Sequence, residues 1–222
     1  MMALAEVLDR LGRICAPPPP PADPFRHVLW DNAGYLVDDQ RRRRLYDRLA
    51  AEIGLDPAAI AAAGDAALMA IAVEGGMHPD VRVQRWRAVA ALVIEAGGDL
   101  DAALRALPLA RARALLKRFP TIADPAADKI LLFARVAALP ALESNGLRTL
   151  ARLGLIMEGK SYDQTYKAGI AVLKAHGPSD VDGLQRAYLA LREHGKTLCR
   201  RSTPECAPCP LSDGCPKSVV SF

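Results

Sequence analysis

The chain has 222 residues, of which 51% are hydrophobic, 24% charged and only 5% aromatic. This composition excludes a disordered chain, and it argues against an all-β sandwich or barrel, which would need more β-branched and aromatic residues. The formal net charge of +4 permits a polyanionic partner without establishing one. Because neither a signal peptide nor an apolar run of about 18 residues is evident, we expect a cytoplasmic protein with no membrane contact.

Apolar residues at helical spacing, bounded by Asp, Pro and Gly, predict helices along most of the chain. The first helix is expected over residues 3–14, and a stiff proline-rich connector follows at 17–21. The next ones are expected near 24–36, 39–49, 57 onward, 79–96, 99–107, 108–118, 125–138, 142–153, 162–176 and 180–194. Strand-type alternation is nowhere sustained, so we predict an all-α fold of roughly ten helices.

Four of the five cysteines gather near the C-terminus with the spacing C-x6-C-x2-C-x5-C, at Cys199, Cys206, Cys209 and Cys215. In a reducing compartment such a group favours metal binding over disulfides. Four thiolates can ligate zinc or an iron–sulfur cluster. Zinc ribbons usually pair two C-x2-C knuckles, so one knuckle with two longer arms fits a [4Fe–4S] cluster better. Cys15 stands apart, and we expect it to be a buried thiol without an assigned role.

The cysteine spacing, together with the approach His194-Gly-Lys-Thr-Leu-Cys199, resembles the cluster loop of the endonuclease III branch of the helix-hairpin-helix DNA glycosylases. The resemblance extends in order from Pro24-Phe25 to Cys215. It implies the two-part all-α fold of that superfamily, a [4Fe–4S] cluster on the four cysteines, a double-stranded DNA partner and a monomer. The expected parts are a six-helix module at 23–138 with its hairpin at about 110–135, and a cluster module of 1–22 plus 139–222 with its loop at 199–215.

The family's hairpin has the form L-P-G-V-G-x-K-T-A, and its turn offers backbone N–H groups to a DNA phosphate. The matching positions implied to contact DNA here are Thr121, Ile122, Ala123 and Asp124. Both turn glycines are replaced, so an ordinary helix–turn–helix packing unit remains the alternative. Pro125 stands where bifunctional members carry the nucleophilic lysine. Lys129, one helical turn later, is either a substitute nucleophile or an exposed helix lysine.

The family's second motif, V-D-T-H-x-x-R-V-x-x-R-L-G, resembles residues 142–154. Glu143 stands at the catalytic aspartate position, and it is either a catalytic carboxylate or a residue favoured by the helix dipole. Ser144 and Asn145 follow it as DNA-contacting or helix-capping residues. The substitution of Glu for Asp extends the carboxylate by one methylene, which changes its placement.

Three further groups of residues are interpreted with two alternatives each. The family's wedge glutamine is absent, and Tyr35 or Leu36 either enters the duplex or packs in the core. Asp31, Asn32, Tyr35 and Asp39 are candidates for a pocket that reads a flipped base. Basic residues of the cluster module either contact phosphates or are solvated: Lys196, Arg200 and Arg201.

The resemblance implies a DNA base-excision glycosylase that hydrolyses the N-glycosidic bond of a flipped base with help from Glu143. Without an amine at Pro125, strand cleavage by β-elimination is expected to be weak or absent. The alternative is a non-catalytic iron–sulfur DNA-binding protein on the same scaffold, which the changed catalytic positions favour. The lesion preference depends on the shape of the pocket and does not follow from the sequence.

Overall fold

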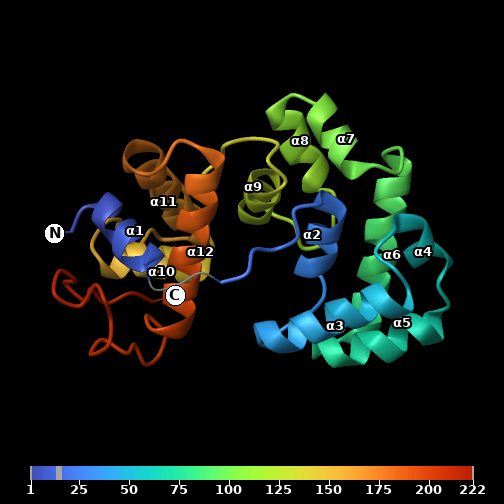
Figure 1. Ribbon diagram of the computed structural model, residues 1–222, viewed down its shortest axis with the longest axis horizontal. Helices are drawn as coiled ribbons and strands as arrows, with labels where there is room; N and C mark the ends of the chain where they lie inside the picture. The colour runs from blue at the N-terminus through green and yellow to red at the C-terminus, as the bar shows by residue number, and fades with distance from the viewer. Residues whose placement is uncertain (1, 14–16, 222) are drawn as a thin grey trace. The chain divides into compact units, whose positions relative to one another are not determined.

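The structure, a computed structural model, describes residues 2–13 and 17–221, so Cys15 lies outside the described residues. In this part of the chain it contains twelve α-helices and one short 3-10 helix (Figure 1). The one β-type pairing found there is an isolated bridge between Tyr35 and Gly76. The predicted all-α fold class is therefore confirmed.

Internal contacts divide the chain into two compact units. The first, called here the cysteine unit, comprises Met1–Pro19 and Leu131–Phe222, and the second, the hairpin unit, comprises Pro20–Ile130. The chain thus passes between the units at residues 19–20 and 130–131. The boundaries expected from the sequence lie at residues 22–23 and 138–139.

The hairpin unit is organised around its long helix α6 (Figure 1). Its helices are α2 (Pro24–Asp31), α3 (Asp39–Glu52), α4 (Pro57–Ala62), α5 (Asp65–Ala72), η1 (Val73–Gly75), α6 (Pro79–Glu95), α7 (Leu100–Ala106) and α8 (Leu109–Leu116). Helices α2, α4 and α5 contact α6, whose Trp86 is fully buried. Burial of this large ring and its aliphatic neighbours stabilises the unit through the hydrophobic effect.

Aspartate caps begin four of these helices as the sequence predicts. The side chains of Asp23, Asp38, Asp56 and Asp99 each accept a hydrogen bond from a backbone N–H in the first turn of α2, α3, α4 and α7. Each cap satisfies a donor that the helix itself leaves unpaired. Pro57 and Pro24 occupy first-turn positions, where their missing N–H is not needed.

Several predicted boundaries are wrong. The helix expected to reach residue 36 ends at Asp31, because the chain turns at Ala33–Gly34 so that Tyr35 can pair with Gly75 and Gly76. The helix expected over 125–138 is α9 (Asp124–Phe133), and it ends where Arg135 takes a left-handed φ of 56°. Helix α5 was not foreseen, and α12 (Val181–Thr197) continues past residue 194.

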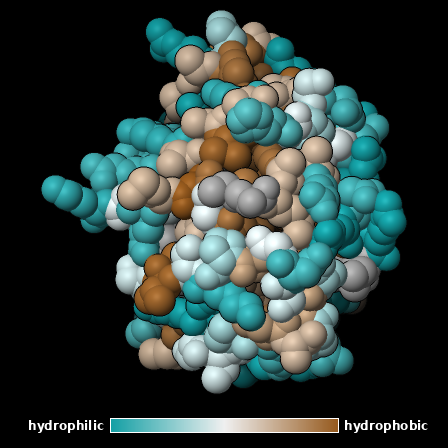
Figure 2. Space-filling view, turned by 90° about the vertical axis from the view of Figure 1, so that its left-hand side faces the viewer, coloured by the Kyte–Doolittle hydropathy of each residue, from teal (hydrophilic) through white to brown (hydrophobic). Residues whose placement is uncertain are grey.

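The cysteine unit packs α1 (Leu4–Gly12), α10 (Ser144–Arg152), α11 (Tyr162–His176) and α12 around one apolar core. Leu11, Leu147, Leu150 and Leu191 are buried there. No helix in the described ranges is long and apolar enough to cross a membrane. On the face shown in Figure 2, apolar side chains (brown) form separate groups between hydrophilic ones (teal).

Helices α10 and α12 cross at Gly195, so we predict that Gly195→Ala destabilises the protein. A Cβ atom there would collide with the backbone carbonyl of Asn145 on α10, which is not the movable end of a side chain. Overpacking of this kind lowers the free energy of unfolding by about 1–3 kcal/mol, measurable by urea denaturation. Gly12→Ala is the matched control, because nothing lies within 4 Å of the added Cβ. An unchanged stability of Gly195→Ala would contradict this packing.

Candidate functional site

Glu143 caps the N-terminus of α10, at the position that the sequence analysis assigns to the catalytic carboxylate. Its Oε1 atom accepts a hydrogen bond of 2.9 Å from the backbone N–H of Gly146, and its Oε2 atom accepts one of 2.7 Å from the Asn145 side chain. Glu143 is half-buried, whereas Ser144 is exposed. The carboxylate is therefore held in one orientation, and it lies at the positive end of a helix dipole.

A buried arginine links this carboxylate to the start of the cysteine loop. The Arg148 guanidinium donates to the side-chain oxygen of Asn145, to the carbonyl of Gly195 and to the carbonyl of Cys199, at 2.6, 2.6 and 2.9 Å. Burial lowers the pKa of Arg148 from its usual value. A continuous chain of hydrogen bonds thus runs from Glu143 through Asn145 and Arg148 to Cys199.

A second arginine of α10 holds the same loop. Arg152 donates to the carbonyls of Cys199, Arg200 and Arg201, and one of its nitrogens lies 3.4 Å from the Cys199 sulfur. Tyr162, at the start of α11, lies close enough to Glu143 to be affected by its charge. Burial, and then the Glu143 carboxylate, raise the pKa of Tyr162 to about 12. The phenol therefore stays protonated beside the carboxylate.

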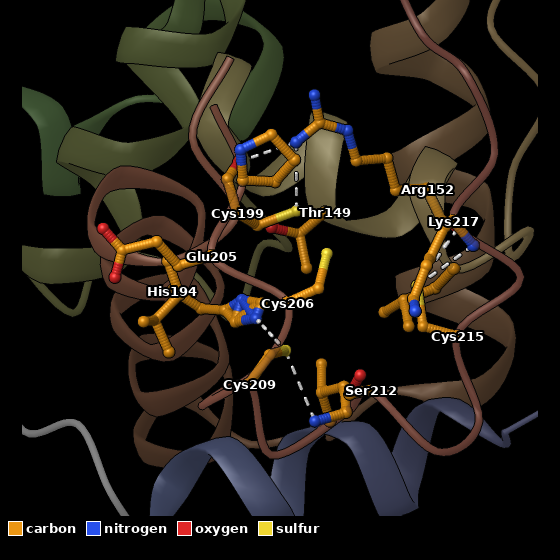
Figure 3. Close-up of a pocket in the computed structure, with 14 residues that line it drawn as sticks. Thr149, Arg152, His194, Cys199, Glu205, Cys206, Cys209, Ser212, Cys215 and Lys217 are labelled. Carbon is orange, nitrogen blue, oxygen red and sulfur yellow. Dashed lines mark hydrogen bonds between the residues drawn. The ribbon is translucent and has the colours of Figure 1, made fainter. Parts of the chain in front are cut away.

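The four cysteines of the tail line one cavity of about 70 Å³ (Figure 3). Residues of α10, α12 and the tail complete its wall, with Thr149, Leu153 and Leu211 contributing apolar surface. The ring of His194 lies 3.3 Å from the sulfur of Cys209. Burial raises the pKa values of the Cys209 and Cys215 thiols.

The chemistry of this donor set suits soft metal ions and iron–sulfur clusters. A zinc site closes four thiolates around one ion at about 2.3 Å. Among the described residues, no group of three or more His, Cys, Asp or Glu side chains forms a ready metal site, which favours neither zinc nor a cluster. The cavity also exceeds the roughly 10–15 Å³ of probe space that one water requires. Four soft donors around a larger apolar space suit a multi-atom cluster, and the assignment of the cluster itself stays a prediction.

The expected hairpin is present as α8 and α9 with a turn between them. Thr121 has a φ of 66°, the left-handed conformation that a glycine would adopt without strain, whereas Ala123 is not in that conformation. The Thr121 hydroxyl donates to the side chain of Asn32, whose amide nitrogen donates to the carbonyl of Pro120. These contacts hold the turn, and Ile122 is buried beneath it.

The hairpin turn carries a negative charge at the start of α9. Asp124 lies in the first helical turn and forms an ion pair of 2.9 Å with Lys117. Its carboxylate occupies the helix end that would otherwise attract a phosphate, and it neutralises a neighbouring cation. Sequence spacing alone does not reveal this pair, because it depends on how α8 and α9 pack.

Lys129 does not project freely into solvent. Its ammonium lies 2.6 and 2.7 Å from the two carboxylate oxygens of Asp31, and both side chains are largely buried. Burial alone would raise the pKa of Asp31, but the charge of Lys129 brings it below its usual value. His27 lies close to this pair and is fully buried.

A separate cavity of about 580 Å³ opens in the hairpin unit near this ion pair. Three of the expected pocket residues line it, Asp31, Asn32 and Tyr35, while Leu36 is 78% exposed. Asp39 is the first residue of α3 and is absent from the lining. Five lining residues around the start of α6 carry no motif and were not expected from the sequence: Met77, His78, Val81, Arg82 and Arg85.

The basic candidates of the cysteine unit differ in their surroundings. Arg200 is exposed and pairs with Glu205, which offsets its charge. Arg201 is exposed and donates weakly to the carbonyl of Ser221 at 3.4 Å. Lys196 is half-buried in the last turn of α12. Of the three, Arg201 offers the most accessible positive charge.

The fold is shared with solved DNA glycosylase structures. A trapped endonuclease III–DNA covalent intermediate, an estranged-adenine complex, matches with a TM-score of 0.76 and 17% identity over 98% of this chain and 97% of that chain. A thermostable thymine-DNA glycosylase matches with a TM-score of 0.76 and 14% identity, over 96% of this chain and 94% of that chain. A non-covalent endonuclease III–DNA complex matches with a TM-score of 0.74 and 18% identity, over 98% of this chain and 97% of that chain. The fold implied by the sequence resemblance is thereby confirmed. No family model and no curated protein matches the chain.

The buried His27 predicts a pH-dependent stability. Burial, and then the charge of Lys129, lower the pKa of His27 from 6.5 to about 3. The folded protein therefore keeps this ring neutral while the unfolded chain protonates below pH 6.5. The stabilisation is complete above that value and is lost as the pH falls towards 3.

Between pH 7 and pH 5, His27 should account for a fall of about 2 kcal/mol in the free energy of unfolding. Urea denaturation of the wild type and of His27→Leu at both pH values isolates this contribution, because other titrating groups are common to both proteins. Parallel pH profiles for the two proteins would show that His27 is not held neutral.

Proposed function

We propose that this protein is a DNA N-glycosylase that acts on a flipped base in double-stranded DNA. The observation that carries the proposal is Glu143, a carboxylate fixed by two hydrogen bonds at the head of α10. It occupies the motif position of the family's catalytic aspartate within a fold shared with endonuclease III. Two of the matching structures are DNA complexes, which supports DNA as the partner.

In the proposed reaction, the oxygen of water bonds to the sugar C1′ and its proton is released, while the base leaves with the bonding electrons and takes up a proton. Positive charge develops on the sugar in the transition state, and a fixed carboxylate stabilises it or polarises the water. The hydrogen bonds that Gly146 and Asn145 donate keep the Glu143 side chain oriented. The carboxylate therefore needs little reorganisation during the reaction.

The same geometry supports hydrolysis without strand cleavage. A Schiff base requires a neutral amine, and Pro125 offers none. Lys129 is the nearest substitute in sequence, but its ammonium is paired with both oxygens of Asp31. Lys129 is thus held by Asp31 and is not free to attack a sugar carbon.

The cofactor proposed for the cysteine unit is a [4Fe–4S] cluster, which Cys199, Cys206, Cys209 and Cys215 would hold through one thiolate each. The donor set and the cavity support this choice. The cluster would supply rigidity to the loop that Arg148 and Arg152 fasten to α10.

A second candidate is a non-catalytic DNA-binding protein on the same scaffold. Both oxygens of Glu143 are engaged in capping α10, which is a sufficient structural role for this residue. The replaced hairpin glycines and the carboxylate of Asp124 also depart from the family's pattern. Base release distinguishes the two functions.

We predict that Glu143→Gln lowers base release by at least about a hundredfold, because the neutral amide no longer stabilises positive charge on the sugar. Purified protein is incubated with duplexes that carry a panel of lesions, and alkali then reveals abasic sites. Glu158→Gln is the matched control in the same unit, since it makes the same change on a half-buried carboxylate that binds Ser221. Melting curves verify that both variants fold.

Binding to a lesion duplex without base release from any substrate would contradict catalysis and support the second candidate. Borohydride trapping on the active substrates tests the lyase in parallel. No covalent adduct is expected, and an adduct lost in Lys129→Met would overturn the assignment of Lys129 to an ion pair.

For the cofactor, we predict brown protein that absorbs near 400 nm and contains about four iron atoms per chain. Cys206→Ser should reduce both signals, because it removes one thiolate of the proposed set. Cys15→Ser is the control, since this cysteine lies outside the cysteine loop. Colourless protein with stoichiometric zinc would refute the cluster.

A further inference from the structure

The four sulfurs of the cysteine loop differ in the N–H donors that reach them. Three of them accept hydrogen bonds from nitrogen: Cys199 from Arg152 at 3.4 Å, Cys209 from the Leu211 backbone at 3.4 Å and Cys215 from the Lys217 backbone at 3.3 Å. Among the described residues, no N–H forms such a bond with Cys206, to which Figure 3 draws no dashed line. Because a donated N–H withdraws electron density from a sulfur, Cys206 keeps the most nucleophilic sulfur of the four.

The stretch that carries Cys206 is also the part of the loop that faces water. Residues 201–205 and 207–208 on its two sides are exposed, and Cys206 itself is half-buried. Cys199, by contrast, is fastened through its carbonyl to Arg152 of α10. We therefore expect a small reagent in solution to reach the sulfur of Cys206 first.

The arm that follows Cys209 is held by the first helix. Arg10 of α1 donates to the carbonyl of Pro210 at 3.1 Å and to the carboxylate of Asp213 at 2.7 Å. A ring nitrogen of His194 on α12 lies 3.3 Å from the sulfur of Cys209. Cys209 thus has a fixed position, while the exposed stretch around Cys206 is the side that can adjust.

A tight turn brings Cys206 to Cys209. The backbone N–H of Cys209 donates to the carbonyl of Cys206 at 3.3 Å, and Ala207 and Pro208 form the turn between them. The end Cα atoms of such a turn lie within about 7 Å, and a disulfide needs them about 4.4–6.8 Å apart. Among the described residues, no other backbone hydrogen bond joins two of the four cysteines. This pair can therefore be bridged with little movement of the backbone.

We propose that Cys206 and Cys209 form a dithiol that hydrogen peroxide oxidises to a disulfide, with Cys206 as the attacking thiol and Cys209 as the resolving thiol. The Cys206 sulfur bonds to one peroxide oxygen, the O–O bond breaks, and the other oxygen leaves as water after it takes up a proton. Cys206 is then a sulfenic acid. The Cys209 sulfur attacks it, the S–O bond breaks, and its oxygen leaves as a second water.

The overall reaction is balanced. Two thiols lose two electrons and two protons to one peroxide, which becomes two waters, and one disulfide forms. The disulfide takes two thiols from the donor set, so oxidation of Cys206 and Cys209 and metal binding by them exclude one another. In reducing compartments, disulfides of this kind are usually transient and sense oxidants. The proposal rests on the turn and its thiols, and neither on base release nor on the cluster.

The test treats the full chain, as purified, with hydrogen peroxide for increasing times. Free thiols are blocked with N-ethylmaleimide, disulfides are reduced and labelled with iodoacetamide, and fragmentation in the mass spectrometer locates the second label. The disulfide of Cys206 and Cys209 should form at least about tenfold faster than any other, and dithiothreitol should reverse it. Cys15→Ser is the control and should leave this disulfide unchanged.

A variant without the resolving thiol separates the two steps. In Cys209→Ser, dimedone should trap a sulfenic acid on Cys206, because no thiol next to it in the turn can displace the oxygen. If this variant melts early, the order of labelling in the wild type decides by itself.

Three results would overturn the proposal: oxidation of Cys199 or Cys215 before the pair, oxidation that dithiothreitol does not reverse, or a loop left unoxidised by peroxide that oxidises free glutathione. Iron and zinc are counted on the same sample before treatment. Protein without iron refutes the cluster and leaves the expected disulfide unchanged, so the two proposals fail separately.

Discussion

The buried guanidinium of Arg148 is the interaction on which the cysteine unit depends. It joins three segments that are far apart in sequence, through Asn145 on α10, Gly195 on α12 and Cys199 at the start of the loop. A buried charge is tolerated only where its donors are satisfied, and this one makes three short hydrogen bonds. Because Asn145 also holds Glu143, the candidate carboxylate and the cysteine loop share one positional constraint.

The sequence predicted the features whose physical cause is local. An aspartate before a helix, as at Asp23 or Asp99, finds its N–H partner three residues later, so the cap is visible in the sequence. The cysteine spacing is also local, and four thiols do line one cavity. Glu143 lies at the head of a helix as the motif implied, and it caps that helix itself.

The remaining features depend on partners that are far away in the chain. Lys129 and Asp31 are 98 positions apart, and no local pattern indicates that they pair. Thr121 at a glycine position suggests a broken turn, yet its contact with Asn32, 89 positions away, helps to hold the left-handed conformation. One side of the cavity, with Asp31, Asn32 and Tyr35, was expected from the sequence, but its α6 side with Arg82 was not, because the wall comes from three separate segments.

Compensation of charge, rather than its amount, decides where the hairpin unit can accept an anion. At the hairpin turn, the carboxylate of Asp124 offsets both the positive end of α9 and the ammonium of Lys117. At the cavity, Lys129 and Asp31 neutralise one another, and Arg82 and Arg85 are left facing neutral acceptors or open space. A phosphate gains more where it replaces no existing carboxylate. The family motif thus points to a turn whose positive charge is already offset by Asp124, whereas no carboxylate in the described ranges forms an ion pair with Arg82 or Arg85.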